Sequence, residues 1–365
     1  MKISIDRNLL EGKLSLAARF IPSRFSSLSS LQGTLLEAKE GELNIYSTNL
    51  NSYFHTKIKI KEKVSFKKLT DPRKIIEFLS LIMPGDISLE VSDKEIIISQ
   101  GKTSGSFPII AYTEFPQPPV LKEKAQKLKT EFFVRDIPLV LFSASTDETR
   151  PVLTGVNFLA QDESMLVVAT DGFRLSFLKT KKNQVFPQML LPRDFLTEII
   201  RLIKDEKEIE FAFSKQEKTA VIRCSEGDFY TRLIEGEFPP FEKVIPADKT
   251  ATVTTDREEL IRNIKTTAVF ARDFSNIVLC EFKQDGLYLK PKLDTAGKSQ
   301  TFQEARLDGE EQTVAFNLKF LLDFLNQIDS KTVIIEVLRP DAPVVFKADN
   351  KPDFIHIIMP IRIQQ

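Results

Sequence analysis

The chain has 365 residues, with 51 basic and 51 acidic side chains and 42% hydrophobic residues. This balance excludes a protein coated in positive charge, although local clusters can still form one basic face. No apolar run approaches the roughly 20 residues of a membrane span, and the start, Met1–Asp6, resembles a strand and a helix start more than a signal peptide. Cys224 and Cys280 lie in separate strand-like runs, so we expect no disulfide and a reducing, cytoplasmic location.

A helix is predicted to begin after Asp6, because Leu10, Leu14, Ala17 and Ile21 fall on one helical face. An aspartate at the N-cap accepts a hydrogen bond from a backbone N–H that otherwise has no partner. Two later segments begin in the same way: Asp136 stands before residues 139–143, and Asp256 before Leu260, Ile264 and Thr267.

A nine-residue helical pattern then appears in each third of the chain, starting at Lys74, Phe195 and Phe320. It is apolar at its second, fifth, sixth and ninth positions, the spacing of one helix face. Each copy carries an acid before the apolar pair and is followed by two strands. The acids are Glu77, Glu198 and Asp323, and the strands are 87–91 and 96–98, 209–213 and 220–222, and 333–337 and 343–346. Chance recurrence is the alternative, but the agreement favours one unit used three times.

The spacing of the copies is that of a domain with its own core rather than that of a solenoid repeat. With alternating strands such as 43–47 and 165–169, each repeat is expected to hold two helices and about eight strands, an α+β fold. Proline-rich segments at 115–119 and 238–241 mark the boundaries between the repeats. We predict domains at 1–125, 126–247 and 248–365. The lysine-rich run at 122–129 is expected to be a solvated linker.

Catalytic motifs are scarce. The only histidines, His55 and His356, are far apart, and neither has a cysteine or second histidine at metal-ligand spacing. There is no P-loop or dinucleotide fingerprint, and Ser104–Ser106 lacks the second glycine of a nucleophile elbow. We therefore expect a binding protein without catalytic, metal or cofactor chemistry. A carboxylate-based hydrolase and a monomeric triple-repeat adaptor remain alternatives.

Four segments resemble blocks of the bacterial DNA polymerase III beta subunit, the sliding clamp family. They are Ala169-Thr-Asp-Gly-Phe-Arg-Leu-Ser176, Arg232-Leu-Ile-Glu-Gly-Glu-Phe-Pro239, Ile357-Ile-Met-Pro-Ile-Arg-Ile363 and, more weakly, Thr149–Gly155. The resemblance implies three clamp-type domains, and two subunits joined head to tail in a ring whose helices line a hole for duplex DNA. It also implies partners: a replicative DNA polymerase subunit, a clamp loader, and repair and replication proteins with a short peptide motif.

The resemblance places a peptide-binding pocket between the second and third domains. Three departures leave the preferred motif open: Phe173 where histidine is usual, Lys243 where arginine is common, and the extension Gln364–Gln365. For residues such as Leu175 the alternative is a plain core role. The residues carried over are Leu153, Thr170, Gly172, Phe173, Arg174, Leu175, Pro239, Lys243, Val244, Ile357, Ile358, Met359, Pro360, Ile361 and Arg362.

The DNA-binding residues are expected among the basic residues of the helices, because phosphate contacts hold DNA without reading its sequence. Arg24 falls where the family places a DNA-contacting arginine; for the others a solvated helix face is the alternative. The candidates are Arg7, Arg24, Arg73, Lys74, Arg193, Arg201, Arg262, Lys265 and Lys319.

The dimer joint is expected, by the same resemblance, to bring Val269 and Phe270 of the third domain against Phe107 of the first. The alternative for Phe270 is a core role at the end of its helix. A row of lysines at 57, 59, 61 and 63 shares one strand face, which the resemblance places outside the ring.

Overall fold

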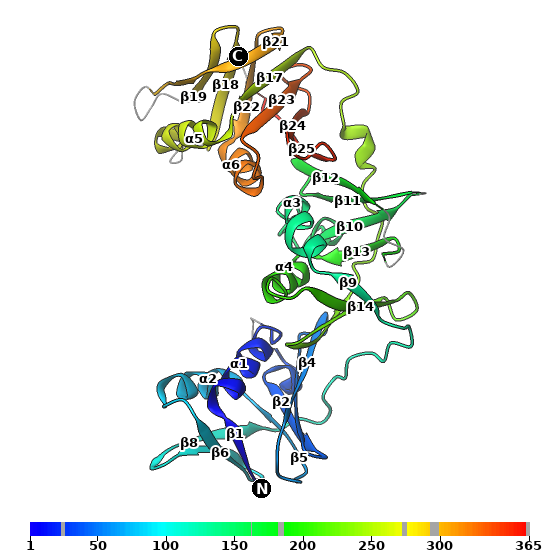
Figure 1. Cartoon of the computed structure of the whole chain (residues 1–365), viewed down its shortest axis with the longest axis vertical. Helices are drawn as coiled ribbons and strands as arrows, with labels where there is room; N and C mark the ends of the chain where they lie inside the picture. The colour runs from blue at the N-terminus through cyan, green and yellow to red at the C-terminus, as the bar shows by residue number, and fades with distance from the viewer. Residues whose placement is uncertain (23–25, 162, 182–185, 272–275, 293–298, 363–365) are drawn as a thin grey trace. The chain divides into compact units, whose positions relative to one another are not determined.

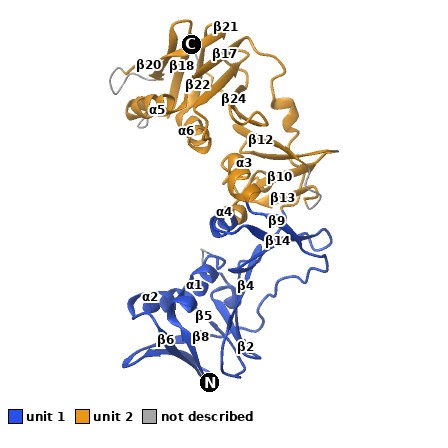
Figure 2. Ribbon diagram, viewed as in Figure 1, with its two compact units in different colours: residues 1–130, 198–233 blue, residues 131–197, 234–365 orange. Residues whose placement is uncertain are grey.

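The computed structural model describes the chain except for residues 23–25, 162, 182–185, 272–275, 293–298 and 363–365 (Figure 1). Arg24 and the extension Gln364–Gln365 therefore lie outside the described residues. The chain forms two compact units, residues 1–130 with 198–233 and residues 131–197 with 234–365 (Figure 2). This division follows continuous sheets rather than repeats, so the predicted boundaries after residues 125 and 247 stay predictions.

The first repeat begins with the predicted helix. Asp6 is its N-cap and accepts a hydrogen bond from the Leu9 N–H, at 2.8 Å, and Leu10, Leu14 and Ala17 are buried as predicted. The elements are β1 (Lys2–Asp6), α1 (Arg7–Ala18), η1 (Ser29–Leu31), β2 (Thr34–Lys39), β3 (Glu42–Thr48), β4 (Ser52–Lys59), β5 (Phe66–Thr70), α2 (Pro72–Leu81), β6 (Asp86–Val91), β7 (Glu95–Gln100) and β8 (Thr103–Ile110).

The second repeat follows the same order, with a shorter first helix. Its elements are β9 (Gln126–Lys129), η2 (Phe132–Asp136), α3 (Pro138–Leu141), η3 (Pro151–Leu153), β10 (Gly155–Ala160), β11 (Ser164–Thr170), β12 (Arg174–Lys181), β13 (Met189–Pro192), α4 (Arg193–Leu202), β14 (Glu208–Ser214), β15 (Thr219–Cys224), β16 (Gly227–Arg232) and η4 (Phe241–Val244).

The predicted helix start at Asp136 is wrong. The chain already turns helically at residues 132–136 as a π-helix, closed by a 3.0 Å hydrogen bond from the Ile137 N–H to the Phe132 carbonyl. Pro138 has no N–H and stands at the first position of α3, whose N-cap is Ile137. Asp136 instead ends the π-helix and faces Lys351 at 3.7 Å.

The third repeat has its predicted cap, because Asp256 accepts a hydrogen bond from the Glu259 N–H at 2.8 Å. Its elements are β17 (Ala251–Asp256), α5 (Arg257–Ala271), β18 (Ile277–Lys283), β19 (Gly286–Pro291), β20 (Thr301–Gln303), β21 (Ala305–Gly309), β22 (Gln312–Asn317), α6 (Leu318–Gln327), β23 (Thr332–Val337), β24 (Val344–Ala348) and β25 (Phe354–Ile358).

Strand order repeats three times, which confirms the predicted α+β unit. One half of each repeat runs β1-β6-β7-β8, β9-β14-β15-β16 or β17-β23-β24-β25, and the other runs β5-β2-β3-β4, β13-β10-β11-β12 or β22-β18-β19-β20. Successive repeats share a sheet, because β4 pairs antiparallel with β16 in the first unit and β12 with β25 in the second. We call these two pairings the first and second joints.

The first joint has an aromatic core. Phe20 stacks on Phe54 with ring centroids 5.6 Å apart, and Phe54 lies 5.0 Å from Phe229 on β16. On β4 and just beyond it, Lys57, Lys59, Lys61 and Lys63 are exposed while Ile58 and Ile60 are buried, as the alternation predicts. Among the described residues, no helix combines the length and apolar character that crossing a membrane requires.

Candidate functional site

A tight turn precedes β12 and presents Phe173 to solvent. The Asp171 carboxylate accepts hydrogen bonds from the backbone N–H groups of Phe173 (2.9 Å) and Arg174 (3.0 Å), and the Thr170 hydroxyl accepts one from the Gly172 N–H (3.0 Å). Gly172 has φ +92°, which a side chain would strain. Phe173 is 59% exposed, so hydrogen bonds hold in place a turn that carries a large apolar side chain on the surface.

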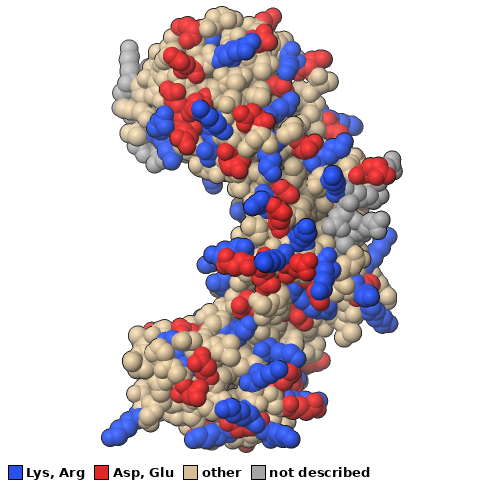
Figure 3. All heavy atoms as spheres, viewed as in Figure 1, with Lys and Arg blue, Asp and Glu red and all other residues tan. Residues whose placement is uncertain are grey.

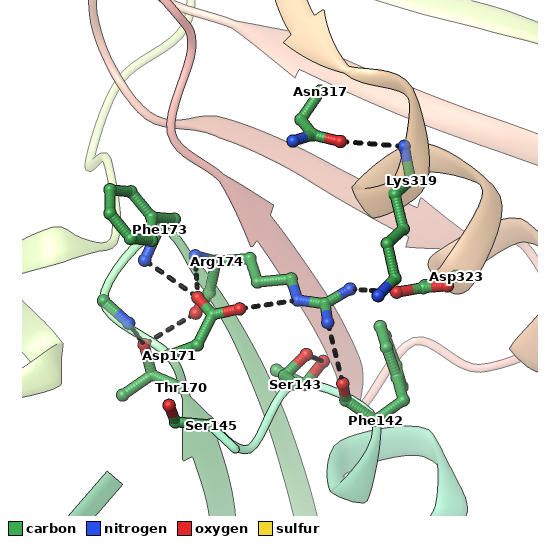
Figure 4. A network of polar contacts seen from close by, with 12 residues as sticks. Phe142, Ser143, Ser145, Thr170, Asp171, Phe173, Arg174, Asn317, Lys319 and Asp323 are labelled. Atoms are coloured by element: carbon green, nitrogen blue, oxygen red, sulfur yellow. Dashed lines mark hydrogen bonds and ion pairs between the residues drawn. The ribbon is translucent and has the colours of Figure 1, made fainter. Parts of the chain in front are cut away.

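Arg174 lies directly behind this turn and is buried (Figure 4). Its guanidinium donates to Asp171 (3.0 Å), to Asp323 on α6 (2.6 Å) and to the Phe142 carbonyl (3.0 Å). Its central carbon also lies 4.6 Å from the ring centroid of Phe320 and 5.5 Å from that of Phe142. Arg174 thus binds α6 of the third repeat to β12 of the second, rather than pointing to a ligand.

His356 continues this network on β25. One ring nitrogen, Nδ1, shares a 2.8 Å hydrogen bond with Ser176, which shares another with Ser143. The ring stacks on Phe324, with centroids 5.1 Å apart and planes 5° apart. Complete burial, together with the positive charge of Arg174, holds the pKa of His356 well below its ordinary value, so the imidazole is neutral.

The C-terminal segment after β25 runs past the same turn. The Met359 N–H donates to the Phe173 carbonyl at 2.8 Å, and the Ile361 N–H donates to the Ala315 carbonyl on β22, also at 2.8 Å. Met359 remains 36% exposed. The segment is therefore fixed by its backbone, which leaves an apolar side chain available beside Phe173.

The chain between the second and third repeats borders the opposite face of this sheet. Phe241 of η4 is buried against Leu175 of β12 and Ile357 of β25. Its neighbours Lys243 and Val244 are exposed as a result. Side chains alternate along β12, so Leu175 meets η4 while Arg174 and Ser176 face the helices.

The structure thus divides the predicted peptide-site residues into two groups within the second unit. Six are buried: Arg174, Leu175, Ile357 and Ile358 take part in the second joint, whereas Leu153 and Thr170 bond residues of their own repeat. Those that are exposed or half-buried can meet a ligand: Gly172, Phe173, Pro239, Lys243, Val244, Met359, Pro360, Ile361 and Arg362.

Most of the basic candidates lie on helices with exposed side chains: Arg73 and Lys74 on α2, Arg201 on α4, Arg262 and Lys265 on α5, and Lys319 on α6. Arg193 is half-buried at the start of α4. Arg7 already has partners within the chain, because its guanidinium donates a hydrogen bond to the Leu79 carbonyl and pairs with Glu11 at 2.9 Å. In the view of Figure 3 basic and acidic side chains are interspersed on both units.

The predicted dimer residues differ in exposure. Phe107 on β8 is 6% exposed and packs edge-on against Phe78 of α2, with ring centroids 5.6 Å apart. On α5, Val269 is 67% exposed and Phe270 half-buried. Sequence reasoning missed further exposed apolar residues near these elements: Leu81 (81%), Met83 (75%) and Phe302 on β20 (47%).

Sequence reasoning also missed the residues that hold Arg174. Phe142, Phe320 and Asp323 are 32 to 149 positions away in the chain, and only the repeated acid at Asp323 gave a signal. Among the described residues, no group of three or more His, Cys, Asp and Glu side chains could hold a metal ion.

Three family models match almost the whole chain in order. They describe the N-terminal domain of the DNA polymerase III beta subunit (residues 1–119), its central domain (127–240) and its C-terminal domain (242–362).

Curated relatives and solved structures agree with these matches. A beta sliding clamp of Synechococcus elongatus is 25% identical over 376 residues, covering all of both chains, and one of Staphylococcus aureus is 25% identical and covers 99% of each. The fold is that of the DNA polymerase III beta chain of Streptococcus pneumoniae (TM-score 0.91, 24% identity, 99% and 100% coverage) and of the Thermotoga maritima beta subunit (0.89, 22%, 100% of both).

Proposed function

Because the chain belongs to the family of DNA polymerase III beta subunits, the beta sliding clamps, we propose that two copies close into a ring around duplex DNA. The ring tethers the replicative polymerase and other proteins to the template. It is loaded by a clamp loader and acts in the cytoplasm, without catalysing a reaction.

The observation that carries the ring is the repetition of joints. Each repeat has two four-stranded half-sheets, and at each joint an end strand of one repeat pairs with an end strand of the next repeat. These pairs are β4 with β16 and β12 with β25. The remaining counterparts are β20 and β8, and β8 pairs with β7 along its length and with β5 only at Ile109 and Ile110. Within the described residues β20 pairs with β19 alone. A contact between β20 of one copy and β8 of another is heterologous, and two such contacts close a ring of six repeats.

The peptide site that we propose is the surface around the turn before β12. Phe173, Val244 and Met359 are exposed apolar side chains, and burying each one against a peptide contributes about 1.5–3 kcal/mol. Lys243 and Arg362 add positive charge at the rim. An apolar surface with few polar groups suits a short motif with large apolar side chains.

The proposed DNA contacts come from Arg73, Lys74, Arg193, Arg201, Lys265 and Lys319. These residues are dispersed over four helices, and Figure 3 shows basic and acidic side chains interspersed on the face in view. Such a distribution suits weak, exchangeable phosphate contacts that let a clamp slide. Arg24 stays a candidate from the sequence alone. Arg7 is a weaker candidate, since its guanidinium is already bonded.

Topological retention tests the ring. The protein is loaded on a nicked circular plasmid by a cognate loader and passed over a sizing column in moderate salt. We expect it to elute with the circle and to be lost when a restriction enzyme linearises the DNA. Equal retention on both forms would show ordinary electrostatic binding and contradict encirclement.

A further inference from the structure

The second helix of each repeat places an acid at the same position. The helices α2, α4 and α6 each have ten residues. Glu77, Glu198 and Asp323 are each the sixth residue of their helix. The three acids are therefore equivalent in structure as well as in sequence.

In two of the three repeats this acid binds an arginine of the preceding repeat. Glu198 pairs with Arg19, the residue that caps the C-terminus of α1. Asp323 pairs with Arg174 at the start of β12, at 2.6 Å. Each pair spans a joint, the first beside β4 and β16 and the second beside β12 and β25.

Glu77 is the exception. It is exposed, and it forms no ion pair with any residue that the structure describes. The next position of the helix differs in the same way, because Ile199 and Phe324 are fully buried while Phe78 is half-buried. Among the described residues no repeat precedes the first one, so the joint face of α2 lacks the cover that α4 and α6 have.

We propose that Glu77 pairs with Lys265 of a second copy of this chain, a role that replaces the phosphate contact suggested above for Lys265. The inference rests on the proposed ring, in which the third repeat of one copy precedes the first repeat of the other. Arg19 is the thirteenth residue counted from the start of α1, and the thirteenth residue of α5 is Val269. Lys265 stands one turn earlier on the same face, and its flexible side chain can span such a turn.

The surroundings of both residues suit this contact. Val269 is 67% exposed next to Lys265, and Leu81 and Met83, which follow Glu77, are 81% and 75% exposed. Apolar groups that flank an ion pair exclude water from it and strengthen it. The contact between the two copies would then combine an apolar patch with one ion pair, as the first joint does with its aromatic core and Arg19–Glu198.

Sedimentation equilibrium of the full chain without DNA tests the pair. We expect Glu77→Lys and Lys265→Glu each to raise the dimer dissociation constant about tenfold, because each places like charges together. The double variant, with the charges exchanged, should return to within about threefold of the original value. Glu148→Lys is the matched control, since Glu148 is an exposed acid of the central repeat with no ion pair among the described residues.

Unchanged dimerisation of Glu77→Lys, or a double variant no tighter than the two single ones, would overturn the pair. Failure of the ring itself looks different, because the unsubstituted chain would then sediment as a monomer near 41.6 kDa at all concentrations. Circular dichroism of each variant, with an unchanged spectrum and melting midpoint, separates weak association from misfolding.

Discussion

The two joints within the chain have the same strand pairing but different chemistry. The first joint is held by the rings of Phe20, Phe54 and Phe229 and by ion pairs near the surface, such as Arg19–Glu198, whose arginine side chain is 34% exposed. The second joint buries its arginine: the Arg174 side chain is 8% exposed and bonds two carboxylates and a carbonyl.

This difference in chemistry indicates which of the two joints must hold its side chains in accurate positions. Apolar packing tolerates small shifts, whereas a buried charge keeps its low energy only with every partner in place. Arg174 shares Asp171 with the turn that presents Phe173, and that turn receives the hydrogen bond from Met359. The polar joint therefore sets the shape of the proposed peptide surface, while the aromatic joint mainly connects repeats.

The largest expected effect is the loss of stability when the arginine of the second joint is removed, compared with the loss when the arginine of the first joint is removed. Arg174→Ala removes a buried guanidinium and leaves the partly buried carboxylates of Asp171 and Asp323 without their cation, which should lower the free energy of unfolding of the second unit by about 3–5 kcal/mol. Arg19→Ala removes a solvent-screened pair and should cost under about 1 kcal/mol. Urea titrations of both variants, followed by tyrosine fluorescence and circular dichroism, measure the difference.

Equal losses in the two variants would contradict this contrast. Arg174→Lys is an informative third variant, because it keeps the charge but cannot reach three acceptors and stack on Phe320 at once. We expect it to fall between the original chain and Arg174→Ala, and to weaken peptide binding even where the protein is fully folded.

The next effect concerns the peptide surface. Deleting residues 359–365 removes Met359 and Ile361 while leaving β25 paired with β12 and β24. Met359 is one of the exposed apolar side chains of the proposed site, and the half-buried Ile361 adds apolar surface beside it. Losing both, at about 1.5–3 kcal/mol for each side chain buried by the peptide, should lower the affinity for a polymerase-derived peptide on the order of a hundredfold or more. Fluorescence anisotropy of a labelled peptide measures this loss.

Sizing of the same truncated protein is the control. The dimer should persist, because the deleted residues do not belong to β8, β20 or the helices beside them. Full peptide affinity after truncation would remove this segment from the site, and a monomeric product would show that the segment supports the ring instead.

The repeated elements could be predicted from the sequence because their signals are local. The caps at Asp6 and Asp256 and the apolar faces of α1 and of the three second helices follow from spacing alone. The prediction that a helix starts at Asp136 was wrong, because residues 132–136 already form a π-helix and Pro138 occupies the first position of α3. A local pattern cannot reveal which of two adjacent starts the chain uses.

The joints and the role of Arg174 could not be predicted because their contacts are distant in the chain. The pairing of β12 with β25 joins residues about 180 positions apart, and no spacing rule links Arg174 to Phe142 and Asp323. The resemblance assigned Arg174 to the peptide site together with its neighbours in the sequence, but its burial indicates that it acts by positioning the turn. The exposed members Phe173, Val244 and Met359 could not be separated from the buried ones without the fold.

The smallest expected effect is a pH dependence confined to the second joint. The pKa of His356 is held well below its ordinary value, whereas in the unfolded chain it returns to about 6.5. As pH falls below about 6.5 the unfolded state therefore binds a proton that the folded state does not, and stability decreases by up to about 1.4 kcal/mol per pH unit. Above that range the imidazole is neutral in both states and contributes no slope.

His356→Phe should remove this component of the slope, since phenylalanine can stack on Phe324 and Phe142 without titrating. The measurement is the melting midpoint between pH 7.5 and 5.5, compared with that of His55→Phe, which removes the other histidine, on β4 at the first joint. His55 lies 3.9 Å from the Asp228 carboxylate, so the difference between the original chain and His356→Phe is the one that isolates the buried imidazole. Since only the second joint buries a histidine completely, we expect a flatter pH profile from His356→Phe. An unchanged profile would mean that a proton can reach His356 without opening the joint.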